Sequence, residues 1–137
     1  MRSAVLDASV VVRWFTADSL SDAALGCRTR FVGVAPDLLP IEVANALRLY
    51  CRTEKLDPSA VAAAVNGLAG QLTIVPSQPL LTTAFGLAVQ LDHSVYDCLY
   101  AALALHEAIP LVTADRRFMK KLAALASVDV IDLKSVG

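Results

Sequence analysis

The feature that most constrains the fold is the regular alternation of short apolar runs with longer segments of helical period along the chain of 137 residues. The runs are rich in β-branched residues and are bounded by turn residues, which is typical of buried strands. We expect five strands, at residues 3–8, 31–35, 72–75, 110–114 and 128–132. We expect helices at residues 9–16, 20–28, 38–54, 58–70, 78–91, 95–107 and 116–126.

This alternation predicts an α/β fold in which helices cover both faces of a parallel sheet, because parallel strands need helical crossovers. The length is typical of one compact core, so we expect a single domain over residues 1–137. Asp37 and the pair Asp57-Pro58 are typical of helix starts, and we expect a helix to begin at each.

Composition narrows the class of protein. Hydrophobic residues make up 56% of the chain and the mean hydropathy is +0.58, which indicates a large covered sheet and an apolar face buried in an oligomer. The stretch from Pro58 to Leu91 carries no charge, but Asn, Gln and Pro interrupt it, which argues against a membrane span. Asp7 and Arg13 break the N-terminal apolar run, so we expect no signal peptide and a cytoplasmic protein.

The net charge and the cysteines argue against two further classes. A net charge of −1 and a pI near 6.0 do not suit indiscriminate nucleic-acid binding, so any such contact must be local. Cys27, Cys51 and Cys98 have neither a C-x-x-C spacing nor the spacing of a zinc site. We therefore expect reduced thiols rather than disulfides or a structural metal.

Four acidic residues stand where solubility does not require them. Asp7 closes the first expected strand and Asp115 follows the fourth, so both are expected at the carboxyl edge of the sheet, where doubly wound folds bind ligands. Glu42 lies near the start of the helix in PDLLPIEVANAL, beside an apolar stripe. Asp97 lies in SVYDCLYAALALH, which is apolar on nearly every side, and a carboxylate there needs a compensating partner.

Carboxylates that converge repel one another unless a cation lies between them. An all-oxygen set without Cys or a suitably paired His favours Mg²⁺ or Mn²⁺ over Zn²⁺. Taken one at a time, the acids also have plainer interpretations: Asp7 and Asp115 as helix caps, and Glu42 as a solvated helix residue. The residue types alone leave both interpretations open.

Four motifs, AVLDASVVV, PIEVANAL, VYDCLYAALA and LVTADRRF, follow one another over nearly the whole chain. With these motifs in this order, the sequence resembles the PIN-domain ribonucleases, and among them the VapC-type toxins of bacterial toxin–antitoxin pairs. The resemblance implies a five-stranded parallel sheet in the order 3-2-1-4-5. It also implies a Mg²⁺-dependent endoribonuclease that hydrolyses RNA phosphodiester bonds with metal-activated water, a homodimer and a cognate antitoxin protein as partner.

The resemblance also implies which residues form the site. The implied metal ligands and catalytic residues are Asp7, Glu42, Asp97 and Asp115, with Ser9 and Thr113 supporting them through hydrogen bonds and Asn45 near the edge. Many relatives carry a further acid where this chain has Arg117, so the resemblance leaves open whether one or two metal ions bind. This chemistry requires no histidine base, and neither His93 nor His106 lies in a catalytic motif.

Two arginines follow Asp115 directly. Arg116 and Arg117 open a predicted helix, where the macrodipole disfavours cations, so we expect them to contact RNA phosphate near the metal site. The plainer interpretation of such a pair is a solvated face.

Two other functions compete with the ribonuclease. A phosphoacceptor receiver-like signalling domain also places acids at strand ends, but it needs paired acids after the first strand and an acceptor aspartate after the third. The segments LDAS and LTIVPS do not supply them. A degenerate PIN fold that acts only as a binding module would not need all four carboxylates.

Overall fold

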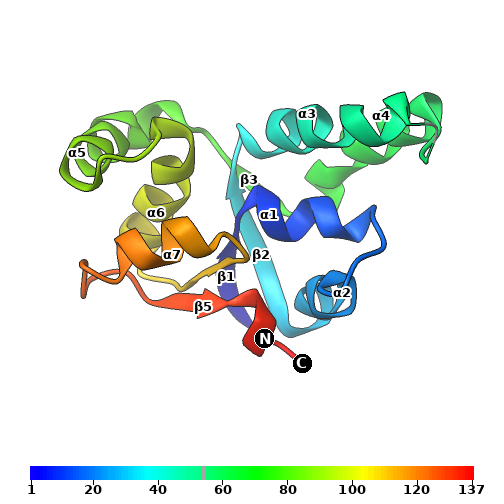
Figure 1. Cartoon of the computed structure of the whole chain (residues 1–137). Helices are drawn as coiled ribbons and strands as arrows, with labels where there is room; N and C mark the ends of the chain where they lie inside the picture. The colour runs from blue at the N-terminus through cyan, green and yellow to red at the C-terminus, as the bar shows by residue number, and fades with distance from the viewer. Residues whose placement is uncertain (54) are drawn as a thin grey trace.

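A five-stranded parallel sheet forms the centre of the computed structural model, which describes residues 1–53 and 55–137 (Figure 1). Its order is β3-β2-β1-β4-β5, so the predicted order 3-2-1-4-5 is confirmed. The strands are β1 (Arg2–Leu6), β2 (Phe31–Pro36), β3 (Thr73–Val75), β4 (Leu111–Thr113) and β5 (Val130–Asp132).

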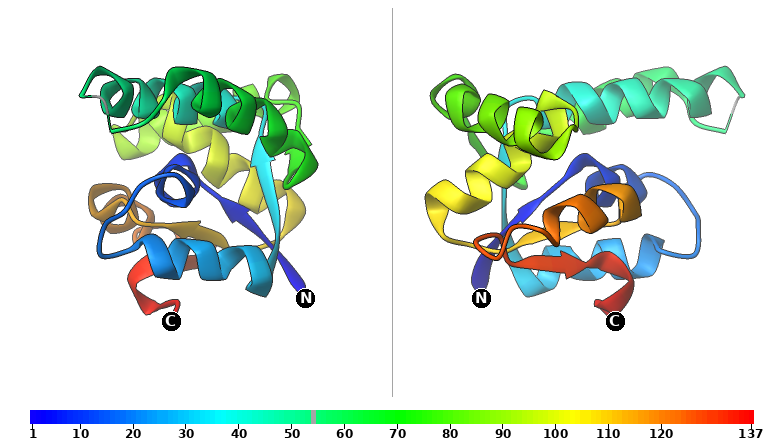
Figure 2. Two further views of the ribbon diagram at one scale, coloured as in Figure 1. Left: turned by 90° about the vertical axis from the view of Figure 1, so that its right-hand side faces the viewer. Right: turned by 60° about the vertical axis from the view of Figure 1, so that its left-hand side comes forward.

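Helices lie on both faces of the sheet (Figure 2). They are α1 (Ala8–Val11), α2 (Ser21–Arg30), α3 (Leu39–Arg52), α4 (Pro58–Asn66), α5 (Leu81–Leu91), α6 (Val95–Glu107) and α7 (Arg116–Leu122). Short 3-10 turns follow or precede several of them: η1 (Val12–Trp14), η2 (Gly67–Gly70), η3 (Gln78–Leu80) and η4 (Leu133–Ser135). The predicted bounds of α6 are confirmed. The predicted helices 9–16, 58–70 and 78–91 are each part α-helix and part 3-10 turn, and the bounds of the others shift by one to four residues at their ends. Residue 54, the last of the predicted helix 38–54, lies outside the described residues.

The two predicted helix starts have opposite outcomes. Asp57 is the N-cap of α4, and its carboxylate accepts the N–H of Ala60 at 3.0 Å, as predicted. The prediction for Asp37 is wrong, because α3 begins two residues later without a side-chain cap. The Asp37 carboxylate instead accepts the backbone N–H and the hydroxyl of Ser77, at 3.2 and 2.5 Å. These donors come from the segment after β3, so tertiary contact outcompetes local capping.

Helix α6 is apolar on nearly every side because it is enclosed. It packs against β1, β2 and β4 on one side and against α5 on the other, and every residue from 98 to 104 is buried. Among the described residues, no helix is both long enough and apolar enough to cross a membrane. All three cysteines are free thiols, as predicted, with Cys27 and Cys98 buried and Cys51 half-buried.

The winding of the chain reverses between β1 and β4, which lie side by side. Leu6 of β1 is level with Val112 of β4 in the parallel register. Asp7 therefore leaves the sheet one residue after this pair, and Asp115 follows three residues after it. Both acids reach the same rim, at the position where doubly wound folds bind ligands.

Gly33 of β2 is required by close packing. A Cβ at this position would lie 2.5 Å from Leu72 Cδ2 and 3.0 Å from Leu6 Cδ1. We expect Gly33→Ala to lower the free energy of unfolding by about 1–3 kcal/mol, because the buried leucines must move. Gly86→Ala is the control: Gly86 lies inside α5 with open space around it, and alanine there should stabilise by about 0.5–1 kcal/mol. Urea unfolding measures the free energy of unfolding of both variants. A change of the same sign in both would contradict the role of Gly33 in close packing.

Candidate metal centre

Asp7 is buried and surrounded by donors. It caps α1, and its carboxylate accepts the backbone N–H of Ser9 at 2.7 Å, the hydroxyl of Ser9, and the hydroxyl of Thr113 at 2.5 Å. Burial nevertheless raises the pKa of Asp7 from 3.8 to about 6, and the hydrogen bonds only partly offset this rise. The ionised carboxylate is therefore costly, and a neighbouring cation would lower that cost.

Ser9 and Thr113 join the two loops that leave β1 and β4. The hydroxyl of Thr113 accepts the N–H of Asp115 at 3.0 Å, and the hydroxyl of Ser9 accepts the N–H of Ala114 at 2.9 Å. Both hydroxyls thus contact Asp7 and the backbone that leads to Asp115. They fix the two acids relative to each other.

Asp115 caps α7, since its Oδ1 accepts the N–H of Phe118 at 3.0 Å. Its other oxygen makes no hydrogen bond within the described parts of the chain. The cap interpretation therefore holds for both Asp7 and Asp115, but in Asp115 it uses only one carboxylate oxygen. The second oxygen is left for a ligand.

Glu42, in the first turn of α3, is half-buried rather than solvated. The hydroxyl of Tyr100, buried in α6, donates to Glu42 Oε1 at 2.6 Å. Burial raises the pKa of Glu42; the Tyr100 hydrogen bond lowers it, and the charges of Asp97 and Asp7 raise it further. Asn45, one turn later, is exposed and has no hydrogen bond from its side chain among the described residues, so its place in the site stays a prediction.

Asp97, in the first turn of α6, has the partner that its apolar setting requires. Its Oδ2 lies 2.7 Å from Nε2 of His93, and its backbone N–H is capped by Ser94 Oγ. His93 is a site residue that the sequence motifs missed. The spacing of four residues between His93 and Asp97 was a possible signal, but His93 precedes the helix, so helical periodicity could not place it.

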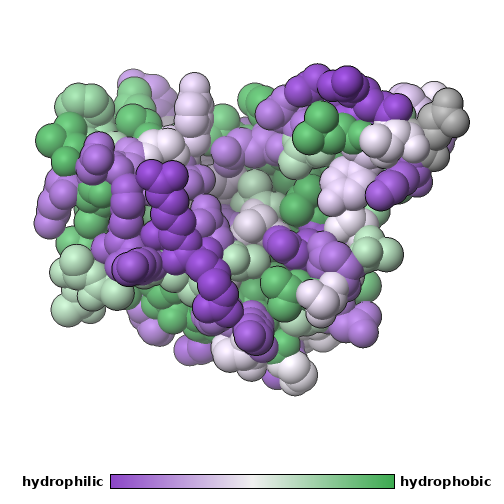
Figure 3. Space-filling model, viewed as in Figure 1, coloured by the Kyte–Doolittle hydropathy of each residue, from purple (hydrophilic) through white to green (hydrophobic). Residues whose placement is uncertain are grey.

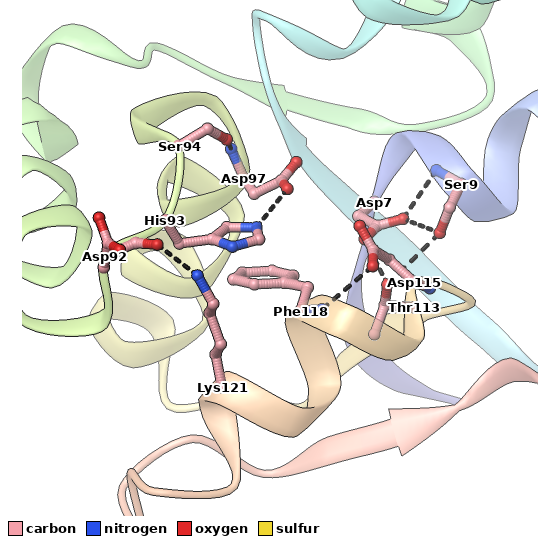
Figure 4. A network of polar contacts seen from close by, with 10 residues as sticks. All are labelled: Asp7, Ser9, Asp92, His93, Ser94, Asp97, Thr113, Asp115, Phe118 and Lys121. Atoms are coloured by element: carbon pink, nitrogen blue, oxygen red, sulfur yellow. Dashed lines mark hydrogen bonds and ion pairs between the residues drawn. The ribbon is translucent and has the colours of Figure 1, made fainter.

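The predicted acids come together in part. Three possible ligand atoms lie within 4.8 Å of one another: a ring nitrogen of His93 and one carboxylate oxygen each of Asp97 and Asp115. They line a hollow of about 360 Å³ with Asp92, Ser94 and Arg117. Asp7 and Glu42 are outside this closest group, but each has its pKa raised by the charge of Asp97. Figure 4 shows Asp7, Ser9, Thr113 and Asp115 gathered near the start of α7, with Asp97 approaching from the first turn of α6 and His93 from the turn before that helix.

The prediction of a site without a suitably paired His is wrong, because the turn between α5 and α6 brings His93 against Asp97. The carboxylates of the group still fit a hard divalent cation. Carboxylate oxygens suit Mg²⁺ and Mn²⁺, and the excess of negative charge around Asp97 calls for a positive charge. Fold and site together define a class: a doubly wound α/β protein with a carboxylate site at the switch point of its sheet.

Comparison with known proteins agrees with this class. The PIN domain family matches residues 4–125. Ribonuclease VapC1 of Mycobacterium tuberculosis (strain CDC 1551 / Oshkosh) is 33% identical over 121 residues, which cover 85% of this chain and 89% of that protein. The chain belongs to the PIN-domain family, as its four motifs predicted, and this membership excludes the receiver-like alternative.

Two solved structures share the fold. VapC20 of Mycobacterium tuberculosis, described as a sarcin-ricin loop cleaving toxin, has a TM-score of 0.69 and 20% identity, over 93% of this chain and 99% of that one. A toxin–antitoxin complex from Klebsiella pneumoniae has a TM-score of 0.66 and 15% identity, over 96% of this chain and 98% of that one.

Proposed function

We propose that the protein is a divalent-metal-dependent endoribonuclease, the toxin of a toxin–antitoxin pair. The observation that carries the proposal is the meeting of Asp97 and Asp115, from two different helices, beside the buried Asp7 at the switch point. The similarity to a protein named a ribonuclease, VapC1, supports the reaction.

In this proposal Asp97 and Asp115 hold Mg²⁺ or Mn²⁺, and Asp7 and Glu42 complete the negative charge around it. The cation, when bound, lowers the pKa of a water and neutralises charge at the scissile phosphate. Ser9 and Thr113 keep Asp7 oriented, and Tyr100 does the same for Glu42. Burial raises the pKa of Asp7 to about 6, so this carboxylate can take up a proton slightly below neutral pH, and burial raises the pKa of Glu42 in the same direction.

The test is to incubate the pure protein with tRNA and mRNA pools in Mg²⁺, in Mn²⁺ and in chelator. We expect cleavage with either metal and none in chelator, and Asp97→Asn should be inactive in all three. Cleavage that persists in chelator, or full activity of Asp97→Asn, would contradict the metal mechanism. RNA binding without cleavage in any metal would instead favour the degenerate binding module.

Arg117 is the basic residue best placed to contact RNA. It lines the hollow beside Asp97 and Asp115, whereas Arg116 forms an ion pair with Asp132 at 3.3 Å. Hydrophilic side chains gather over α7 on this face (Figure 3). We expect Arg117→Ala to weaken RNA binding. The slope of the logarithm of the RNA-binding constant against the logarithm of the salt concentration should also become smaller in magnitude by about 1, because one phosphate contact is lost.

Arg116→Ala is the matched control for this prediction and should leave the slope nearly unchanged. The measurement is a salt series of RNA affinities in chelator, where no cleavage occurs. Equal slopes for the wild type and Arg117→Ala would mean that Arg117 does not contact an RNA phosphate.

The partner antitoxin follows from the same proposal. The Klebsiella pneumoniae structure of similar fold is a complex of a toxin with an antitoxin. An acidic hollow of this size suits a basic side chain of such a partner, which would compete with the metal and with RNA. We propose that the antitoxin covers the hollow between α6 and α7.

The proposed homodimer has support from exposed apolar side chains on the predicted uncharged stretch 58–91. Leu81, Phe85 and Val89 of α5 are exposed by 47%, 61% and 68%. Leu81 also lines a hollow of about 400 Å³ together with Ile41 and Tyr96, which are exposed as well. Figure 3 shows hydrophobic residues on this side of the surface, over α5. A second copy of the chain would cover them.

We expect Val89→Asp to convert the dimer to a monomer, because the interface would bury an unpaired charge. Light scattering across a dilution series measures the molar mass. Leu25→Asp, on α2 and away from α5, is the control and should leave the dimer intact. A wild-type monomer at all concentrations would remove the dimer.

A further inference from the structure

We infer that His93 is a positioning residue for Asp97, and that His93 and Phe118 together form a spacer that fixes Asp97 relative to Asp115. The inference deepens the proposed function, on which it rests for the role of the two acids as cation ligands. It concerns how the chain prepares the site for the cation.

The hydrogen bond between His93 and Asp97 gives the imidazole a defined role. Nε2 lies 2.7 Å from Oδ2, and the side chain of His93 is only 8% exposed. An ionised carboxylate can only accept, so Nε2 carries the proton of this pair. The bond occupies Oδ2 of Asp97, sets the rotation of the carboxylate, and leaves Oδ1 for a ligand.

Asp97 contacts the edge of the imidazole, and Phe118 of α7 packs against one face of the same ring. The two rings stack with centroids 4.8 Å apart and an angle of 12° between their planes, and Phe118 is fully buried. Phe118 also donates its backbone N–H to Asp115 Oδ1 at 3.0 Å. One residue therefore contacts His93 through its ring and Asp115 through its backbone, and this links the two acids through a rigid path (Figure 4).

The backbone of His93 is fixed as well. It follows Asp92, which ends α5 in a left-handed conformation with φ of 49°, and its own N–H donates to the carbonyl of Ala88 at 3.1 Å. Lys121 of α7 donates from Nζ to the carbonyl oxygen of Asp92. The turn that carries His93 is thus tied to α7 by Lys121 and by the ring stack.

These contacts hold Asp97 and Asp115 ready for a cation before it binds. Groups that orient metal ligands in this way typically account for 10–100-fold in metal affinity. A histidine that ligated the metal through Nε2 would need that nitrogen deprotonated, and its hydrogen bond to Asp97 would be lost, whereas ligation through Nδ1 would keep that bond but would occupy Nδ1. Donor and ligand roles therefore predict different behaviour.

Two substitutions separate the donor from the ring. His93→Phe keeps the stack on Phe118 but removes the donor, and His93→Gln keeps a donor at similar reach but removes the ring. His106→Phe, at an exposed position near the end of α6, is the matched control. For each, Mn²⁺ affinity is measured by isothermal titration calorimetry, and RNA cleavage is measured as a function of Mn²⁺.

We expect His93→Phe to bind Mn²⁺ about 10–100-fold more weakly and to regain cleavage at saturating Mn²⁺. His93→Gln should recover most of the lost affinity, and His106→Phe should match the wild type. Wild-type affinity in His93→Phe, or equally weak binding by the Phe and Gln variants, would overturn the inference. A wild type that neither binds Mn²⁺ nor cleaves RNA would defeat the proposed function instead.

A measurement on the wild type covers the case in which His93→Phe does not fold. Nitrogen-15 NMR of the imidazole, with and without saturating Mg²⁺, should show Nε2 protonated in both states. Loss of this proton on Mg²⁺ binding, or a coordination shift of the Nδ1 resonance, would mean that His93 ligates the metal, which overturns the positioning role.

Discussion

Replacing Asp7 by Asn is expected to reduce RNA cleavage by at least about 10³-fold, because loss of this charge removes several kcal/mol of cation and transition-state stabilisation. The protein should still fold. Asparagine has the same shape, and the hydroxyls of Ser9 and Thr113 can rotate to serve either as donors or as acceptors for its amide. Mn²⁺ titration calorimetry measures the loss of cation affinity, and a cleavage assay measures the loss of activity.

The matched control for this prediction is Asp22→Asn, the same exchange at an exposed position in the first turn of α2. It should cleave RNA and bind Mn²⁺ as the wild type does. If Asp7→Asn retained full activity while folded, Asp7 would be a helix cap only. Its charge would then have no part in the metal site.

Without a divalent cation, the contribution of Asp7 should make the free energy of unfolding fall as the pH rises from about 4 to 7. Burial raises the pKa of Asp7 from 3.8, its ordinary value, to about 6. Between these values the folded state holds the proton and the unfolded state does not, so stability decreases with pH. The shift corresponds to about 3 kcal/mol. The pKa of Glu42 is raised as well, so it acts in the same direction.

Asp7→Asn isolates this contribution. It should match the wild type in stability near pH 4 and exceed it by up to about 3 kcal/mol above pH 6, as measured by urea unfolding in chelator. Added Mg²⁺ should then stabilise the wild type more than the variant, because the variant keeps Asp97 and Asp115 but lacks the charge of Asp7 beside them. A stability difference that is constant from pH 4 to pH 7 would show that burial of the Asp7 charge is not the cause.

The acids at the sheet rim illustrate why the positions of several site residues can be predicted from the sequence. The strands are short and continuously apolar, and the residue that follows such a strand must leave the sheet at its carboxyl edge. Asp7 and Asp115 therefore lie at one rim, as their places after the first and fourth strands predict. Asp97 was recognised because a carboxylate in the apolar segment 95–107 is costly without a partner.

The wrong prediction for Asp37 and the plainer interpretation of Glu42 fail for one physical reason, which is that side chains find partners across the fold. Asp37 was expected to cap a helix, but it accepts hydrogen bonds from Ser77, 40 residues away. Glu42 alone suggested a solvated residue, yet the hydroxyl of Tyr100 in α6 reaches it. Nothing local to either residue indicates these donors.

By itself, the sequence determined the parallel α/β sheet, its helical crossovers and the four carboxylates, because strand and helix periods and burial costs are local properties of the chain. Only the tertiary structure decided which acids meet most closely and what positions them. His93 became part of the site because α7 brings Phe118 against its ring and Asp115 to within reach of Asp97. That arrangement depends on packing between helices that are distant in the chain, which no local pattern encodes.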